Sequence, residues 1–269
     1  MDIDFGLLDR ALSIVTEERA DALFTIPAER LPDREQAERL LEVYREQIKG
    51  KDIQVAATYY AACWRVVPAA LLYMVAGCDG GVDFSLKNLT IQIGIVNDYP
   101  RFFFVIKDSA KNAWPTGDIS EWREEVLGAF IRDTLRPVME TASAISGLPV
   151  AQLWGQMPLG VEFYLDYLGK QMGDPSVTEP FKEQYAFFSR VLDAQWFGLK
   201  RNPFDLKETW IEDPYRPGEM TRMKPTCCLA YRTDSGHGYC YGCPKLSKAD
   251  REAKRKELVA AMAAKEKAT

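Results

Sequence analysis

The chain has 269 residues, of which 47% are apolar and 27% are charged, a balance typical of a folded protein that buries its own core. Its formal net charge of −5 argues against a general nucleic-acid binder, since that class is usually basic. The N-terminus lacks the basic and apolar stretches of a signal peptide, and the longest nearly uncharged apolar run, 66–77, has 12 residues where a membrane span needs ~20. We therefore expect a cytoplasmic protein with no transmembrane segment and no nucleic-acid partner.

Two helices are predicted in the first part of the chain. Asp33 and Gln36 have the spacing of a capping box, and the apolar residues behind them recur at helical spacing as far as Gly50, which suits a helix end. Residues 53–75 are apolar on nearly all sides, which is typical of a central buried helix. Pro68 is expected to kink or divide that helix, because proline cannot donate the helical hydrogen bond.

The pattern then changes to that of a β-hairpin. Residues 86–95 alternate apolar and polar side chains, 97–100 carry turn residues, and 102–106 are aromatic and β-branched. A helix is predicted to follow from Asp118, with Pro137 near its end.

Three further helices are predicted, from Pro149 to Leu168, over 181–197, and from a cap at Ser247 to the C-terminus. Residues 200–224 are rich in proline and charge without a clear period, which indicates a long surface connection. The predicted fold class is α+β, predominantly helical, with a small antiparallel β-sheet.

Four of the six cysteines lie within 17 residues near the C-terminus: Cys227, Cys228, Cys240 and Cys243. In a reducing cytosol such a concentration indicates metal binding or redox chemistry in preference to structural disulfides. Four thiolates select zinc or an iron–sulfur cluster. We predict that these cysteines form a C-terminal loop that holds a [2Fe–2S] cluster.

A structural zinc site is the alternative. Zinc ribbons usually use two Cys-x-x-Cys pairs, and here only Cys240 and Cys243 have that spacing. The adjacent Cys227 and Cys228 would point to opposite faces of an extended strand, so both can bind only if the backbone bends there. A cluster with two separated iron atoms tolerates this better than one tetrahedral ion, which favours the cluster. A vicinal disulfide is a third, less favoured option.

The histidine, the two isolated cysteines and four of the tryptophans are interpreted as structural residues and not as parts of a site. His237 is the only histidine, which excludes a Rieske centre with its two histidine ligands, and we interpret it as a polar loop residue in preference to a replacement ligand. Cys63 and Cys78 stand beside apolar runs and are interpreted as buried, inert thiols. Four tryptophans are assigned to core packing in preference to a ligand pocket: Trp114, Trp122, Trp154 and Trp196.

In its cysteine motif the chain resembles the FhuF family of ferric siderophore reductases, whose signature is Cys-Cys and, after a short loop, Cys-x-x-Cys. The segments PAALLYMVAG (68–77), DFSLKNLTIQI (83–93) and LWG (153–155) are also similar to the family domain. The loop between the pairs is one residue longer than in the family, which is expected to alter its shape and not its ligands. Carried over by position, the family's cluster ligands are Cys227, Cys228, Cys240 and Cys243.

The resemblance implies one-electron reduction of siderophore-bound Fe(III) to Fe(II), with release of iron in the cytoplasm. It implies a siderophore-binding domain at 51–225 and an iron–sulfur segment at 226–246. The residue pattern predicts a helical extension at 1–50, packed on the main domain, and a charged helix at 247–269. The Gly-rich stretch at 77–81 does not fit a dinucleotide fingerprint, so we expect electrons from a ferredoxin, a flavodoxin or a separate NAD(P)H-dependent reductase. A non-enzymatic electron carrier or sensor and a structural zinc module are the competing functions.

Four basic residues are candidate substrate contacts. Arg222, Lys224 and Arg232 flank the cysteines, and Lys87 belongs to the family-like DFSLKN segment, although each also fits a solvated surface charge. Residues 244–269 carry eight Lys or Arg against four Asp or Glu. This excess would suit peripheral membrane contact or an acidic electron donor, and a solvated helix is the simpler interpretation.

Overall fold

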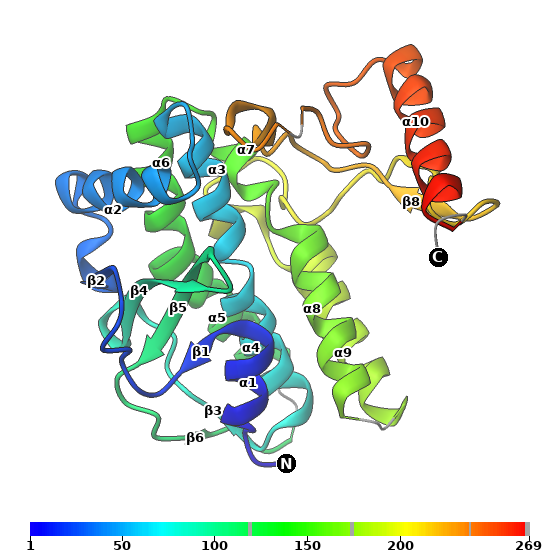
Figure 1. Cartoon of the computed structure of the whole chain (residues 1–269). Coiled ribbons are helices and arrows are strands. Elements are labelled where there is room, and N and C mark those ends of the chain that lie inside the picture. Colours follow the sequence, from blue (N-terminus) through cyan, green and yellow to red (C-terminus); the bar gives the residue numbers. More distant parts are fainter. Residues whose placement is uncertain (118–119, 173–174, 237, 267–269) are drawn as a thin grey trace.

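The computed structural model describes the whole chain except residues 118–119, 173–174, 237 and 267–269. It confirms the α+β class, with 53% of the chain in helices and 13% in strands. Helices surround a small sheet, and the C-terminal helix lies away from that sheet at the other side of the molecule (Figure 1).

The main sheet has four strands in the order β1-β5-β4-β2. They are β1 (Ile14–Val15), β2 (Phe24–Pro27), β4 (Leu89–Val96) and β5 (Tyr99–Ile106). The predicted hairpin is confirmed as β4 and β5, and its turn is the pair Asn97 and Asp98, whose φ values of 51° and 65° suit a tight hairpin turn. The β2–β4 and β4–β5 pairs are antiparallel, as expected, and β1 adds one parallel pair with β5, so this sheet is mixed.

The first 50 residues contribute two strands to this sheet. Besides α1 (Phe5–Leu12), η1 (Ala28–Arg30) and α2 (Arg34–Gln47), they supply both of its edge strands, β1 and β2. This corrects the expectation of a helical extension. The strands were missed because each has only two to four residues, too few for a period to show.

The predicted cap of α2 is confirmed, since the Asp33 carboxylate accepts hydrogen bonds from the N–H groups of Glu35 and Gln36 at 2.9 and 3.2 Å. The helix ends before Gly50, because Lys49 takes the left-handed conformation with φ 51°. Gly50 instead forms an isolated β-bridge with Thr233.

The central apolar stretch forms α3 (Ile53–Cys63) and α4 (Val66–Gly77), and Pro68 lies in the first turn of α4, as expected for a proline that divides a helix. Taken together, Ile53–Gly77 is long and apolar enough to cross a membrane, with 25 residues, although 72% of its most apolar part is buried inside the protein. Aromatic contacts join α3 to the sheet, including Trp64 against Phe104 at 5.1 Å.

Two predicted helix boundaries move at prolines. The helix predicted to end near Pro137 continues as α5 (Ser120–Phe130), a π-helical turn (Ile131–Leu135) and α6 (Arg136–Ser146). Pro137 is tolerated because it lies in the first turn after the π-helical segment. The predicted cap at Asp118 lies outside the described residues. The single helix expected over 149–168 is α7 (Val150–Trp154) and α8 (Pro158–Gln171), which Pro158 begins.

The remaining elements include several that the patterns did not predict. The helix expected over 181–197 begins earlier, as α9 (Pro175–Ala186) with a π-helical turn (Phe187–Val191), and a separate 3-10 turn follows (Ala194–Phe197). The supposed connection at 200–224 contains the hairpin of β7 (Trp210–Glu212) and β8 (Met220–Arg222). The other short elements are β3 (Gly80–Gly81), β6 (Asn112–Ala113) and the 3-10 turns Leu86–Asn88 and Ala230–Arg232. The last helix is α10 (Lys248–Glu266), and the Ser247 hydroxyl caps it by accepting from the Asp250 N–H at 3.1 Å.

Candidate metal centre

Polar side chains of α3 and α7–α8 fasten the segment that carries the first cysteine pair. The Thr58 hydroxyl donates to the carbonyl of Cys228 at 2.7 Å, across 170 positions of sequence. The Gln156 amide donates to the Thr226 hydroxyl at 2.6 Å, and that hydroxyl donates to the carbonyl of Gln152 at 3.1 Å. Three residues from two distant segments, Thr58, Gln152 and Gln156, therefore fix where Cys227 and Cys228 lie on the body of the protein.

The backbone bends sharply beside the adjacent cysteines. Leu229 has φ 59° and ψ 18°, the left-handed conformation that a residue with a side chain rarely adopts. The backbone N–H groups of Leu229 and Ala230 act on the sulfurs of Cys227 and Cys228 respectively, where they favour the thiolate and oppose a rise in its pKa. The bend that two adjacent ligands require is thus present, and it aims backbone donors at both sulfurs.

The four sulfurs form two pairs. The Cys227 and Cys243 Sγ atoms lie 3.5 Å apart, and Cys228 interacts with Cys240, whose thiol favours the Cys228 thiolate and lowers its pKa. Two sulfurs that share one tetrahedral metal ion at ~2.3 Å would lie about 3.8 Å apart, so the first pair is already close to that geometry. Its two members are buried, with 7% and 2% of their surface exposed, whereas Cys228 and Cys240 are half-buried.

The thiol pKa values differ between the buried pair and the half-buried pair. Burial raises the pKa of the Cys227 thiol above its ordinary value. The Cys240 thiol, with help from the positive charge of Lys224, lowers the pKa of Cys228 to about 5, and the same interaction raises the pKa of Cys240. The Lys224 Nζ lies 3.8 Å from the Cys228 sulfur. Burial and these two sulfurs also raise the pKa of Tyr59, which lies next to them on α3.

The described residues contain no group of three or more Cys, His, Asp or Glu side chains gathered closely enough for one metal ion. The donor set is two thiol pairs within one loop. Thiolates are the ligands of zinc and of iron–sulfur clusters, and a [2Fe–2S] cluster is commonly held by four cysteines.

Arg251 of α10 holds the second cysteine pair from behind. Its guanidinium donates to the carbonyls of Tyr241, Cys243 and Leu246, the latter two at 2.9 and 3.3 Å. One side chain thus ties the Cys-x-x-Cys turn and the start of α10 together.

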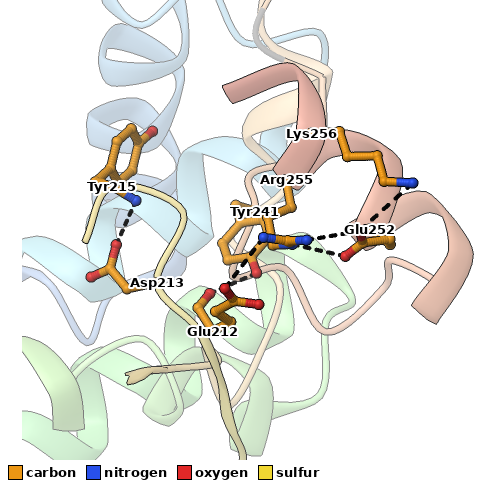
Figure 2. Close-up of polar contacts among 7 residues, drawn as sticks. All are labelled: Glu212, Asp213, Tyr215, Tyr241, Glu252, Arg255 and Lys256. Atoms are coloured by element: carbon orange, nitrogen blue, oxygen red, sulfur yellow. Dashed lines mark hydrogen bonds and ion pairs between the residues drawn. The ribbon is translucent and has the colours of Figure 1, made fainter. Parts of the chain in front are cut away.

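A second set of polar contacts joins the same turn to the β7–β8 hairpin (Figure 2). The Tyr241 hydroxyl donates to the Glu212 carbonyl at 2.7 Å, and Arg255 pairs with the Glu212 carboxylate at 3.3 Å and with Glu252 at 2.8 Å. Lys256 adds a looser pair with Glu252 at 3.9 Å. Arg251 and Arg255 therefore anchor α10 to the Cys-x-x-Cys turn and to the β7–β8 hairpin.

A cavity of about 740 Å³ opens beside Cys228. It lies between α3, α8, the β4–β5 turn and the cysteine segment, and we call it the Cys228 cavity. Its walls include Tyr59, Arg65, Gln156, Lys224 and Cys228. Cys228, one member of the half-buried pair, thus borders a space large enough for a small chelate.

Of the four predicted substrate contacts, Lys224 alone lines this cavity. Arg222 is engaged by Glu162 at 2.7 Å and by Glu208 at 2.9 Å, and Arg232 by Asp52 and by Gln54 at 2.6 Å. Both arginines therefore stabilise the attachment of the cysteine segment and have no charge left unpaired for a substrate.

Lys87 lies at the far end of the hairpin. It precedes β4, whereas the turn that borders the Cys228 cavity follows β4, and 8 residues at ~3.3 Å each separate the two by roughly 26 Å. Its neighbour Asn88 is buried and bonds Asp83 and Asp108 through its side chain, a structural role.

The tryptophans pack in or against the core, as predicted, and Cys78 is buried, whereas Cys63 is partly exposed and lines the Cys228 cavity. Trp154 is fully buried against Phe197 at 5.3 Å, and Trp114 packs on Trp122 at 4.9 Å. Trp196 packs over Gly128, where an added Cβ would lie 2.3 Å from its ring. Burial raises the pKa of both Cys63 and Cys78. His237 lies outside the described residues.

Arg65 is the site residue that the motifs did not reveal. One signal was available, since it is the only charged residue between Asp52 and Asp79. A single charge in an apolar stretch of this kind usually has a specific reason to be there.

Comparison with known proteins identifies no relative: no protein-family model matches the sequence, and no curated protein matches it.

Proposed function

We propose that the protein is a ferric siderophore reductase with a [2Fe–2S] cluster held by Cys227, Cys228, Cys240 and Cys243, as its resemblance to the FhuF family implies. The observation that supports the proposal is the division of these thiols into two pairs, one buried and the other with Cys228 on the wall of a cavity. Two pairs suit a centre with two metal ions, and a ligand sulfur on the cavity wall suits electron transfer to a bound molecule.

When bound, such a cluster supplies chemistry in steps of one electron. The residues of the chain prepare the site for it. Thr58 and Arg251 fix the two ends of the loop, and the N–H groups of Leu229 and Ala230 act on the sulfurs, where they stabilise added negative charge. Lys224 adds a positive charge beside Cys228 on the cavity side.

The proposed substrate is Fe(III) chelated by the hard oxygen donors of a siderophore. One electron converts it to Fe(II), which such donors hold less tightly, and no covalent bond of the chelator breaks. A ferredoxin, a flavodoxin or an NAD(P)H-dependent reductase would return the electron, with the reaction taking place in the cytoplasm.

The test is to purify the protein anaerobically and measure its metal, sulfide and spectra. A [2Fe–2S] protein is red-brown and contains about two iron atoms and two sulfides per chain. The reduced protein is then mixed with ferric siderophores, and fast reoxidation with release of Fe(II) is expected. A colourless zinc protein would contradict the cluster. Slow reoxidation that does not depend on the chelate would indicate an electron carrier or sensor instead.

A further inference from the structure

Arg65 carries a charge that the protein itself leaves uncompensated. It lies between α3 and α4 on the wall of the Cys228 cavity, and its Nε is buried without a hydrogen-bond partner. None of the described residues forms an ion pair with its guanidinium, which lies 5.6 Å from the ring centre of Tyr164. A partly buried cation whose Nε is shielded from water and has no partner is costly, so a partner from outside the chain is expected.

The position of this side chain is fixed by packing. An added Cβ on Gly160 would lie 2.1 Å from the Cδ of Arg65, so the glycine makes room for the arginine stem. Arg65 is therefore held in place along α8 before any ligand enters, which lowers the entropy lost on binding.

Lys224 provides a second cation on the same cavity, beside Cys228. Lys224 is exposed to solvent, as are the other charges of the lining, Lys49, Asp98 and Asp234, whereas Arg65 is partly buried. Because Coulomb interactions are stronger where less water surrounds them, Arg65 dominates the charge that a ligand in the cavity meets.

We propose that the Cys228 cavity is a binding site for an anionic ligand, gripped by Arg65 and Lys224; resting on the proposed function, that ligand is an anionic ferric chelate of the catecholate class. Tyr44 and Tyr59 also line the cavity, and flat anionic rings are recognised by guanidinium groups and aromatic faces together. A neutral chelate, such as a ferric trihydroxamate, lacks the charge that Arg65 selects.

The experiment measures binding with gallium(III) chelates, which are not reduced. A gallium tris-catecholate, which is anionic, and a neutral gallium trihydroxamate are titrated by calorimetry into the full-length protein as purified. The wild type should bind the anionic complex more tightly. Arg65→Gln should weaken that binding by about tenfold and leave the neutral complex unaffected, and Arg65→Lys should restore part of the loss.

Lys224→Gln should give a smaller loss in the same direction, and Lys87→Gln, at the far end of the hairpin, should give none. Thermal unfolding is recorded for each variant, and Lys224→Gln decides the outcome if Arg65→Gln does not fold. Equal affinity of the wild type for both complexes, or unchanged affinity in a folded Arg65→Gln variant, would overturn the proposal.

The readout is independent of iron reduction. If a protein without a cluster binds the anionic gallium complex, the anion site is supported and the reductase is contradicted. If neutral and anionic ferric chelates are reduced equally fast and Arg65→Gln has no effect, the reductase is supported and the anion site is contradicted.

Discussion

The body of the protein, residues 1–204, and its C-terminal segment, residues 205–266, are held together by different interactions. The body has a continuous core with fully buried aromatic residues such as Trp64, Trp154 and Phe104. Among the described residues of the C-terminal segment, the buried apolar side chains are those of Pro214, Cys227, Leu229 and Cys243. A segment with so little burial cannot form a core of its own, so its order depends on polar anchors and, if the proposed cluster is bound, on its metal ligation.

The largest effect that would test this contrast is expected from Cys243→Ser. Removing one sulfur from the buried pair should abolish the iron content, and amide hydrogen exchange should become fast over 205–266 while the body stays protected. Cys63→Ser is the matched control, since that thiol contacts Tyr44 in the body, and it should leave iron content unchanged. A segment that remains protected without metal would show that polar anchors suffice.

The next effect concerns the body. Trp154→Ala should lower the free energy of unfolding by about 3–5 kcal/mol in a denaturant titration, because it leaves a cavity beside Phe197. Trp210→Ala, in the C-terminal segment, should cost less than about 1 kcal/mol, since 51% of its surface is exposed. Similar losses for the two variants would contradict the division into a packed body and a thinly packed segment.

A smaller effect should come from the junction of the two regions. An added Cβ on Gly155 would lie 2.6 Å from Cγ2 of Thr226, so Gly155→Ala should push the cysteine segment off α7 at a cost of about 1–3 kcal/mol. The hydrogen exchange of residues 224–232 should report the loosening. Gly242→Ala is the control, because its Cβ would meet nothing closer than 3.8 Å. Equal protection in both variants would place the attachment elsewhere.

The smallest predicted effect is that of Arg251→Gln. Losing its hydrogen bonds to the Cys243 and Leu246 carbonyls should reduce the local stability of the Cys-x-x-Cys turn by about 1–2 kcal/mol, measured by hydrogen exchange. Lys256→Gln on the same helix breaks only a 3.9 Å pair with Glu252 and should have little effect (Figure 2).

Features that depend on residues a few positions apart were predictable from the sequence. The Asp33 cap, the division at Pro68 and the β4–β5 hairpin follow from local propensity and period, and the cysteine motif is read directly. The edge strands β1 and β2 and the β7–β8 hairpin were missed because two to four residues are too few to show a period.

The sequence by itself determined the class of fold, the central apolar helices and the four clustered thiols, since each is encoded in composition or short-range spacing. Tertiary structure alone decided which sulfurs face each other and which cations remain unpaired. Arg232 meets Gln54 across 178 positions, and Thr58 meets Cys228 across 170. Contacts of this kind arise when distant segments pack together, so charge pairing at the cavity leaves no local pattern in the chain, and only the folded protein separates Arg65 and Lys224 from the arginines that hold the segment in place.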